Sequence, residues 1–133
     1  MKKTTIACIA LLLMSVQINA QSGLKIPKLS TAINQLISVL KLDVLQTGKI
    51  RDIFTSSYSD ANQLKAKLVT ASNDQKKKAY SELITKTDDK IKGVLKGKQV
   101  TEFANWRTNW TNSFKAANPK ASEIKQLEND LLL

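Results

Sequence analysis

The sequence predicts an all-α protein, a long antiparallel helical hairpin flanked by shorter helices. Through most of the chain, apolar residues recur at three- and four-residue spacing, which is typical of amphipathic helices. Residues with β-branched side chains never alternate cleanly with polar residues over the length of a strand. The two prolines, Pro27 and Pro119, bracket the periodic region, so neither one interrupts a predicted helix.

Residues 1–20 have the three parts of a secretory signal peptide. Lys2 and Lys3 give a positive start, residues 6–16 form an apolar run too short to span a bilayer, and Ala20 puts a small residue at the cleavage point. We therefore expect a periplasmic or secreted protein that is cleaved near Ala20. Cys8 precedes most of the apolar run, which is the wrong order for a lipoprotein signal. The alternative is a buried N-terminal helix.

A polar leader is expected at residues 21–29, and a helical domain at residues 30–118. The first helix is expected at residues 30–40, where Ser30 or Thr31 can cap a periodic apolar face. A second, long helix starts at Asp43, because Asp43 and Gln46 have the spacing of a capping box. Its apolar stripe runs through Leu45, Ile50, Ile53, Phe54, Ser57, Ala61, Leu64, Leu68 and Ala71, with Tyr58 at the border.

A third helix is predicted after Ser72, which forms a second capping box with Gln75. Because few residues separate the second and third helices, they should pair as an antiparallel hairpin. A fourth helix is expected at residues 98–116 and ends before Pro119. Residues 119–133 are predicted to be a tail, with a loose amphipathic helix through Ile124, Leu127 and Leu131.

The composition argues against an enzyme. Beyond residue 20 the chain contains no Cys and no His, which removes thiol nucleophiles, imidazole bases and the usual zinc ligands. The carboxylates are scattered, and the adjacent pair Asp88-Asp89 is expected to be helix surface. No glycine-rich phosphate loop is present. We therefore expect no catalytic residue, no metal site and no cofactor.

The chain is strongly basic, with 21 Lys and Arg against 11 Asp and Glu, a net charge of +10. For an exported protein this charge favours anionic membranes or proteins as partners, and we expect no nucleic acid. The lysines at 76, 77 and 78 are candidates for steering a client protein by charge; the alternative is an ordinary solvated helix face.

Aromatic residues supply the second group of candidates for client binding. Phe103, Trp106 and Trp110 share one face of the fourth helix, with Arg107 beside them. Phe54 lies in the apolar stripe of the second helix and Tyr58 at its border. Such residues could form an adaptable apolar surface. The alternative, favoured by their helical spacing, is that they belong to the core.

A short frame, Leu-x-x-x-Gln, occurs at two predicted helix starts. Leu42, Asp43 and Gln46 form the first copy, and Leu95 and Gln99 mark the second. This pair resembles the LTxxQ motifs of the Spy/CpxP-like periplasmic proteins, with Asp43 and Lys96 in place of the two threonines. The resemblance implies a small helical envelope protein, often an antiparallel dimer, that binds partly unfolded proteins without nucleotide or acts with an envelope sensor in stress responses.

The predicted function is ATP-independent binding of unfolded or stress-damaged envelope proteins, as a chaperone-like or stress-adaptor protein. A homodimer is expected because a lone hairpin would leave much apolar surface uncovered. The alternative is a cationic amphipathic protein that acts on anionic membranes or lipids. A third reading is a regulatory partner of an envelope sensor protein.

Overall fold

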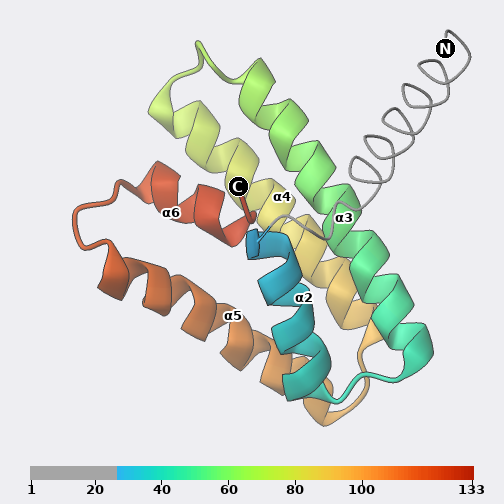
Figure 1. Ribbon diagram of the computed structural model, residues 1–133. Helices are drawn as coiled ribbons and strands as arrows, with labels where there is room; N and C mark the ends of the chain where they lie inside the picture. The colour runs from blue at the N-terminus through green and yellow to red at the C-terminus, as the bar shows by residue number, and fades with distance from the viewer. Residues whose placement is uncertain (1–26) are drawn as a thin grey trace, which may run out of the picture.

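The computed structural model describes residues 27–133, and in this part of the chain every regular element is an α-helix (Figure 1). This confirms the all-α prediction. The helices follow in the order α2 (Pro27–Leu40), α3 (Val44–Lys67), α4 (Asn73–Val94), α5 (Lys98–Ala117) and α6 (Glu123–Asp130). The predicted signal peptide and most of the predicted leader lie outside the described residues.

Helix α2 begins at Pro27, three residues before the expected start at Ser30. Proline suits the first position of a helix because an N–H group there would have no hydrogen-bond acceptor within the helix. Leu29, which was placed in the leader, is fully buried in the core. The apolar repeat of Ile33, Leu36 and Leu40 is evident in the sequence, and the buried face of α2 begins one turn before it, at Leu29.

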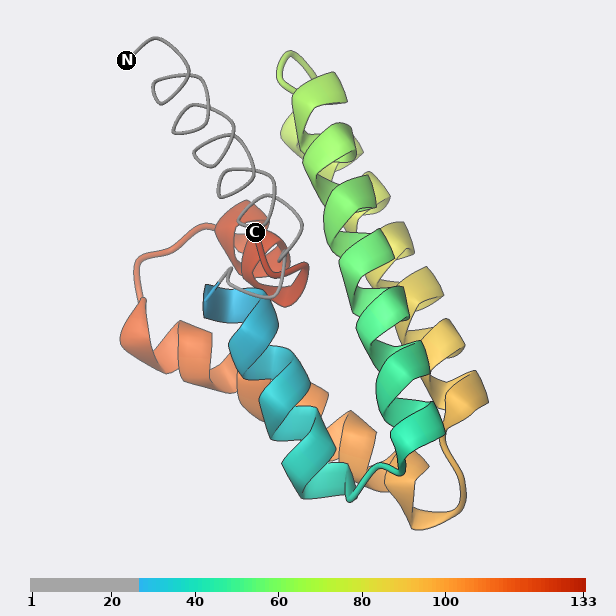
Figure 2. The same cartoon turned by 45° about the vertical axis from the view of Figure 1, so that its right-hand side comes forward.

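Helices α3 and α4 form the predicted antiparallel hairpin, and both of the predicted capping boxes are present. The Asp43 carboxylate accepts from the Gln46 backbone N–H at 2.7 Å, and the Gln46 side chain accepts from the Asp43 N–H at 3.2 Å. Ser72 and Gln75 make the equivalent pair of bonds at the start of α4. The turn between the two helices lies at one end of the molecule (Figure 2).

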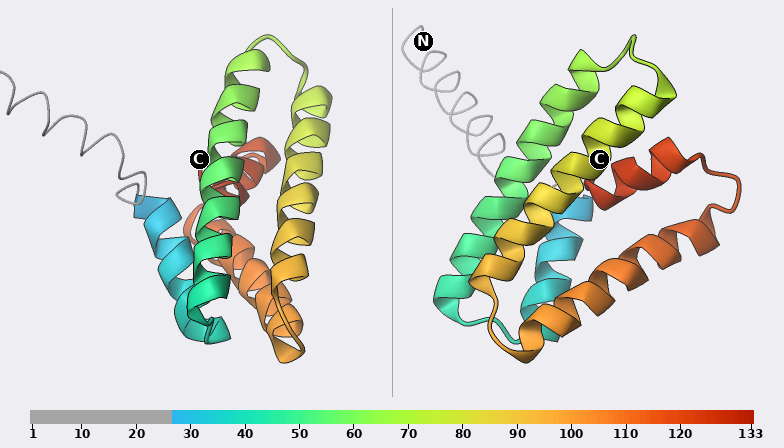
Figure 3. Two further views of the ribbon diagram at one scale, coloured as in Figure 1. Left: turned by 90° about the vertical axis from the view of Figure 1, so that its right-hand side faces the viewer. Right: turned by 180° about the vertical axis from the view of Figure 1, so that it is seen from behind.

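The other three helices lie on one side of this hairpin (Figure 2). Helix α2 packs against α3 and α5, and α6 packs against α4 and α5. Seen from behind, α5 runs away from the base of the hairpin and α6 returns toward it (Figure 3). The α4–α5 connection turns at Gly97, whose φ of 52° is a left-handed conformation that glycine adopts without strain.

The chain after Pro119 is part of the packed fold rather than a loose tail. Ser122 caps α6 by accepting from the Lys125 N–H, and every residue from Glu128 to Leu132 is buried. Leu131 joins a small apolar cluster with Ala61 and Tyr80, while Leu132 joins the main core. The helical unit therefore continues beyond the expected boundary at residue 118.

Candidate functional site

Three of the aromatic candidates for client binding are core residues. Phe54, Phe103 and Trp106 are no more than 6% exposed. The Trp106 ring stacks on Phe103 with their centroids 5.9 Å apart and meets the edge of Phe54 at 6.3 Å. Phe54 and Phe103 offer no surface to a client in this structure, and Trp106 exposes only 6% of its surface. The alternative that they belong to the core describes them correctly.

Tyr58 and Trp110 are half-buried at the margin of this core. The Trp110 ring lies 5.3 Å from Trp106, and its indole N–H donates to the Asn129 carbonyl at 3.1 Å. The polar edge of Trp110 therefore binds the last turn of α6. Part of its apolar face remains accessible.

Arg107 lies between α4, α5 and α6 rather than at an open surface. Its guanidinium donates to both carboxylate oxygens of Asp88, at 2.5 and 3.2 Å, and to the Asp130 carbonyl at 2.9 Å. It also lies 5.3 Å from the Trp106 ring centre, within range of a cation–π interaction. Asp88, expected to be helix surface, is thus half of a largely buried ion pair, while its neighbour Asp89 is exposed.

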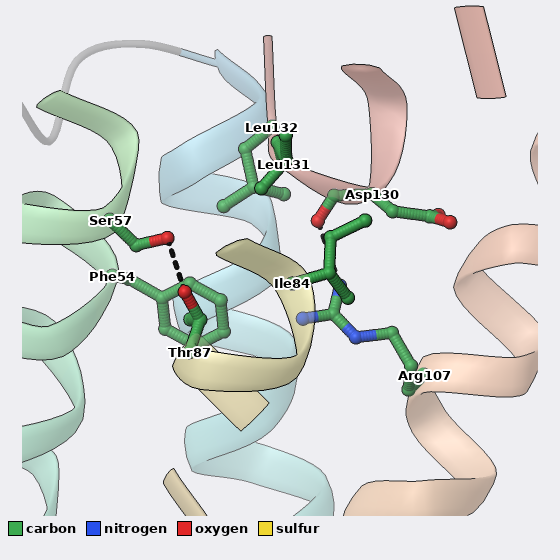
Figure 4. Close-up of a pocket in the computed structure, with 8 residues that line it drawn as sticks. All are labelled: Phe54, Ser57, Ile84, Thr87, Arg107, Asp130, Leu131 and Leu132. Atoms are coloured by element: carbon green, nitrogen blue, oxygen red, sulfur yellow. Dashed lines mark hydrogen bonds between the residues drawn. The ribbon is translucent and has the colours of Figure 1, made fainter. Parts of the chain in front are cut away.

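Figure 4 shows the polar junction around Arg107, where Ser57 and Thr87 share a hydrogen bond of 2.7 Å. Ile84, Leu131 and Leu132 fill the remaining space, which is too small for a water molecule. The junction thus joins the hairpin to α5 and α6. It has no room for a ligand.

The carboxylate of Asp130 is buried at this junction. Burial raises its pKa above the ordinary value of 3.8, and the Thr111 hydroxyl and the Arg107 charge act in the opposite direction. The Thr111 hydroxyl donates to the Asp130 carboxylate at 2.8 Å. Because desolvation is the larger effect, the charged form of Asp130 is held at a cost to the fold.

The three consecutive lysines differ in their surroundings. Lys77 pairs with Glu123 of α6 at 2.5 Å, and this hydrogen-bonded contact raises the pKa of Lys77. Lys76 is half-buried, and Lys78 is exposed. Lys67 and Lys86 line a shallow groove between α3 and α4. The hairpin therefore carries accessible positive charge, although Lys77 is tied to α6.

The two motif glutamines, predicted as capping residues, also bind each other. Gln46 Nε2 donates to Gln99 Oε1 at 2.8 Å, and Gln99 Nε2 donates to Gln46 Oε1 at 3.2 Å. Each Nε2 also reaches the last carbonyl of a helix, Val94 for Gln46 and Leu40 for Gln99. Each Oε1 accepts the backbone N–H three residues earlier, at Asp43 or Lys96. This amide pair joins four helix ends.

The leucines of the motif serve as packing residues. Leu95 is buried in the main core, and Leu42 packs against it while half-buried. Lys96 makes no side-chain cap, and the N-cap position of α5 is Gly97. In the second copy of the frame Gln99 makes the same kinds of bond as Gln46, but no side chain takes the capping role that Asp43 has in the first copy.

An open groove of about 350 Å³ lies between α2 and α5, and sequence reasoning missed it. Its walls are the two tryptophans of the chain together with three exposed polar residues, Gln35, Asn109 and Ser113. The Trp106 indole N–H donates to Gln35 Oε1 at 3.1 Å. Within the described part of the chain, the Gln35 amide NH₂, the Asn109 side chain and the Ser113 hydroxyl have no hydrogen-bond partner. No charged side chain lines the groove.

Periodicity alone gave no sign of this groove. Gln35 faces away from the buried stripe of α2, and nothing in its local sequence places it beside a tryptophan 71 residues later. The groove appears only when α2 crosses α5. It has the form of a small binding site, with aromatic walls and a few polar groups that can fix a ligand's orientation.

Other kinds of site receive no support from the described residues. Between residues 27 and 133 no cluster of three or more carboxylate, His or Cys side chains could hold a metal ion. None of the helices described is both long and apolar enough to cross a bilayer. The chain matches no protein-family model, and neither a curated protein nor a solved structure is significantly similar to it.

Proposed function

We propose that this protein is an exported, ATP-independent binding protein for unfolded or stress-damaged envelope proteins, a chaperone-like or stress-adaptor protein. The observation that carries the proposal is the groove between α2 and α5. The paired motif glutamines and the all-helical fold add support, because they accord with the resemblance to Spy/CpxP-like proteins. In this proposal the protein acts by binding, without catalysis and without a cofactor.

The chemistry of the groove suits a segment of unfolded chain. Such a segment presents apolar side chains together with backbone N–H and C=O groups that need partners. The face of Trp110 can cover an apolar side chain, since aromatic rings bind apolar groups over a large area. The Gln35 and Asn109 amides and the Ser113 hydroxyl can donate to or accept from the client backbone.

The lysines act before this contact forms. The net charge of +10 and the exposed lysines of the hairpin attract anionic chains over distance, which raises the rate of encounter. Contact with the uncharged groove then decides how long a client stays.

A homodimer remains a prediction. It was expected because a lone hairpin would leave much apolar surface uncovered. In the structure α2, α5 and α6 cover one side of the hairpin, so that argument no longer supports a dimer.

The test is an aggregation assay with a chemically unfolded model protein and no nucleotide. Ser113→Phe should fill the groove and weaken protection, because Ser113 is exposed and the larger ring can enter the space beside Trp110. Ser56→Phe places the same ring on an exposed position of α3 and serves as the matched control. The proposal is wrong if the purified protein gives no protection, or if Ser113→Phe protects as well as Ser56→Phe.

Tryptophan fluorescence gives a second readout. The chain has two tryptophans and both line the groove; Trp110 is half-buried and Trp106 is buried, so a bound client should change mainly the emission of Trp110. Binding of an apolar client peptide that lacks tryptophan should shift the emission to shorter wavelength. Unchanged emission in the presence of a client that the protein protects would place client binding elsewhere.

A further inference from the structure

The exposed apolar residues of the described chain are concentrated at one end of the molecule. Only four large apolar side chains between residues 27 and 133 are exposed. Three of them lie within seven residues, Val39 at 51%, Val44 at 89% and Leu45 at 77% exposure. Isolated exposed apolar residues are ordinary on a protein surface, but such a cluster is a feature of interaction sites.

Val44 and Leu45 lie outside the buried core. They are the first two residues of α3, and Gln46 after them turns inward to form the amide pair with Gln99. In this turn Gln46 is buried, at 6% exposure, while Leu45 faces solvent. Polar residues would serve the first turn of α3 equally well.

Lysines are numerous at the same end of the molecule as these apolar residues. The α2–α3 and α4–α5 connections lie at the same end of the molecule (Figures 1 and 2), where Gln46 and Gln99 hold them together. We call residues 39–49 and 92–99 the basic end. It contains a single carboxylate, Asp43, and five exposed lysines: Lys41, Lys49, Lys92, Lys96 and Lys98.

Lys41 occupies a position where glycine would be less strained. Its φ is 49°, and it directly follows the last residue of α2, where a left-handed residue ends many helices. The Leu42 N–H closes this turn on the Ile37 carbonyl at 3.3 Å. Glycine adopts that conformation without steric cost, so the lysine adds positive charge to the basic end at some expense of backbone energy.

From this arrangement we infer that the basic end docks on the surface of an anionic lipid bilayer. Val44 and Leu45 would enter the boundary between headgroups and acyl chains, and the lysines would bind the anionic headgroups around them. The charge of the lysines and of the lipid surface are complementary. Two apolar side chains cannot span a bilayer, so the protein would attach to one surface without opening it. This inference does not depend on the proposed function.

The experiment is sedimentation of the purified protein with vesicles of phosphatidylglycerol and phosphatidylethanolamine, compared with vesicles of phosphatidylcholine. Binding should occur on the anionic vesicles, weaken as salt is raised and release no trapped dye. Val44→Ser combined with Leu45→Ser should weaken binding at least about tenfold, because both side chains leave the lipid phase. Lys41, Lys96 and Lys98 replaced by Gln should weaken it further and reduce its salt dependence.

Val69 supplies the matched control. It is 72% exposed and follows α3 at the opposite end of the hairpin, so Val69→Ser should leave vesicle binding unchanged. All variants share the same N-terminal segment, so their differences report on the described residues alone, and thermal melts check that each one folds. The inference is overturned if the Val44 and Leu45 variant binds as tightly as the parent, if both vesicle types bind equally, or if dye is released.

Discussion

At the scale of single residues, the reciprocal pair of Gln46 and Gln99 is the most consequential contact. The sequence predicts that each glutamine caps a helix, because the spacing to the helix start is local. Their pairing depends on how the chain folds between them, over 53 residues, and no local pattern carries that information. Each amide makes four hydrogen bonds. Removal of one glutamine side chain therefore leaves polar groups of both motifs without a hydrogen-bond partner.

Loss of either glutamine should therefore destabilise the fold. Gln46→Ala or Gln99→Ala is expected to lower the free energy of unfolding by about 1–3 kcal/mol, because the partner amide and a helix carbonyl lose their bonds. The double variant should cost less than the sum, since both changes remove the same interaction. Urea denaturation measures this, with Gln75→Ala at an exposed capping box as the control. Strictly additive losses would contradict a direct coupling.

Asp130 gives the second prediction at this scale. Burial raises its pKa above 3.8, so the folded protein holds this proton more tightly than the unfolded chain. Its contribution to the free energy of unfolding must then fall as the pH rises through the interval between 3.8 and the raised value. Asp130→Asn keeps an acceptor for Thr111 and removes the charge.

The Asp130→Asn variant should therefore be more stable than the parent at neutral pH, and the difference should vanish in acid. Urea denaturation at several pH values checks this, with Asp52→Asn on an exposed face of α3 as the control. A variant that is less stable than the parent at neutral pH would show that the Arg107 charge outweighs desolvation.

At the scale of elements, local sequence determined where most helices start and long-range packing determined what they contact. The boxes at Asp43 and Ser72 are visible in the sequence because a cap spans only four residues. Periodicity placed Leu45 in the buried stripe of α3, yet Leu45 is 77% exposed and Gln46 is buried in its place. A polar side chain is buried at this position because the Gln46 amide makes four hydrogen bonds inside the protein.

The ion pair between α4 and α5 was also beyond local reasoning. Asp88 and Asp89 are adjacent on α4 and point in different directions. Which of them forms an ion pair depends on the position of Arg107 in the fold, and Arg107 binds Asp88. Asp88→Asn should lower the free energy of unfolding by about 1–3 kcal/mol, because the half-buried guanidinium loses its counter-charge. Asp89→Asn, one residue along, should change it by less than about 0.5 kcal/mol. Thermal melts of the two variants make the comparison, and equal effects would refute the assignment.

At the scale of the whole molecule, charge was easier to anticipate than shape. The net charge of +10 follows from composition, whereas the groove exists only because α2 crosses α5. The sequence likewise predicted a hairpin with much uncovered apolar surface, followed by a tail after Pro119. Leu131 and Leu132 nevertheless bury fully against the hairpin and the core, with Asn129 and Asp130 held by the side chains of α5.

The charge leads to a prediction about rates. Salt should slow capture of an unfolded client, since exposed charges are screened beyond about 8 Å at physiological ionic strength, and should leave a formed complex largely intact. Replacement of Lys76, Lys77 and Lys78 by Gln should slow association in the same way. An equal loss of charge at Lys86, Lys90 and Lys92 tests whether position matters. Stopped-flow fluorescence measures both rates, and association that is indifferent to salt would exclude steering by charge.

The amide pair also has a consequence for the order in which the chain folds. Helices α3 and α4 are neighbours in sequence, so their hairpin closes a short loop and can form early. The two glutamines can meet only after α4 has returned to the start of α3 and α5 has begun. We therefore expect their bonds to form late, on the native side of the folding barrier, where an interaction slows unfolding far more than it speeds folding. The pair would then lengthen the lifetime of the folded protein.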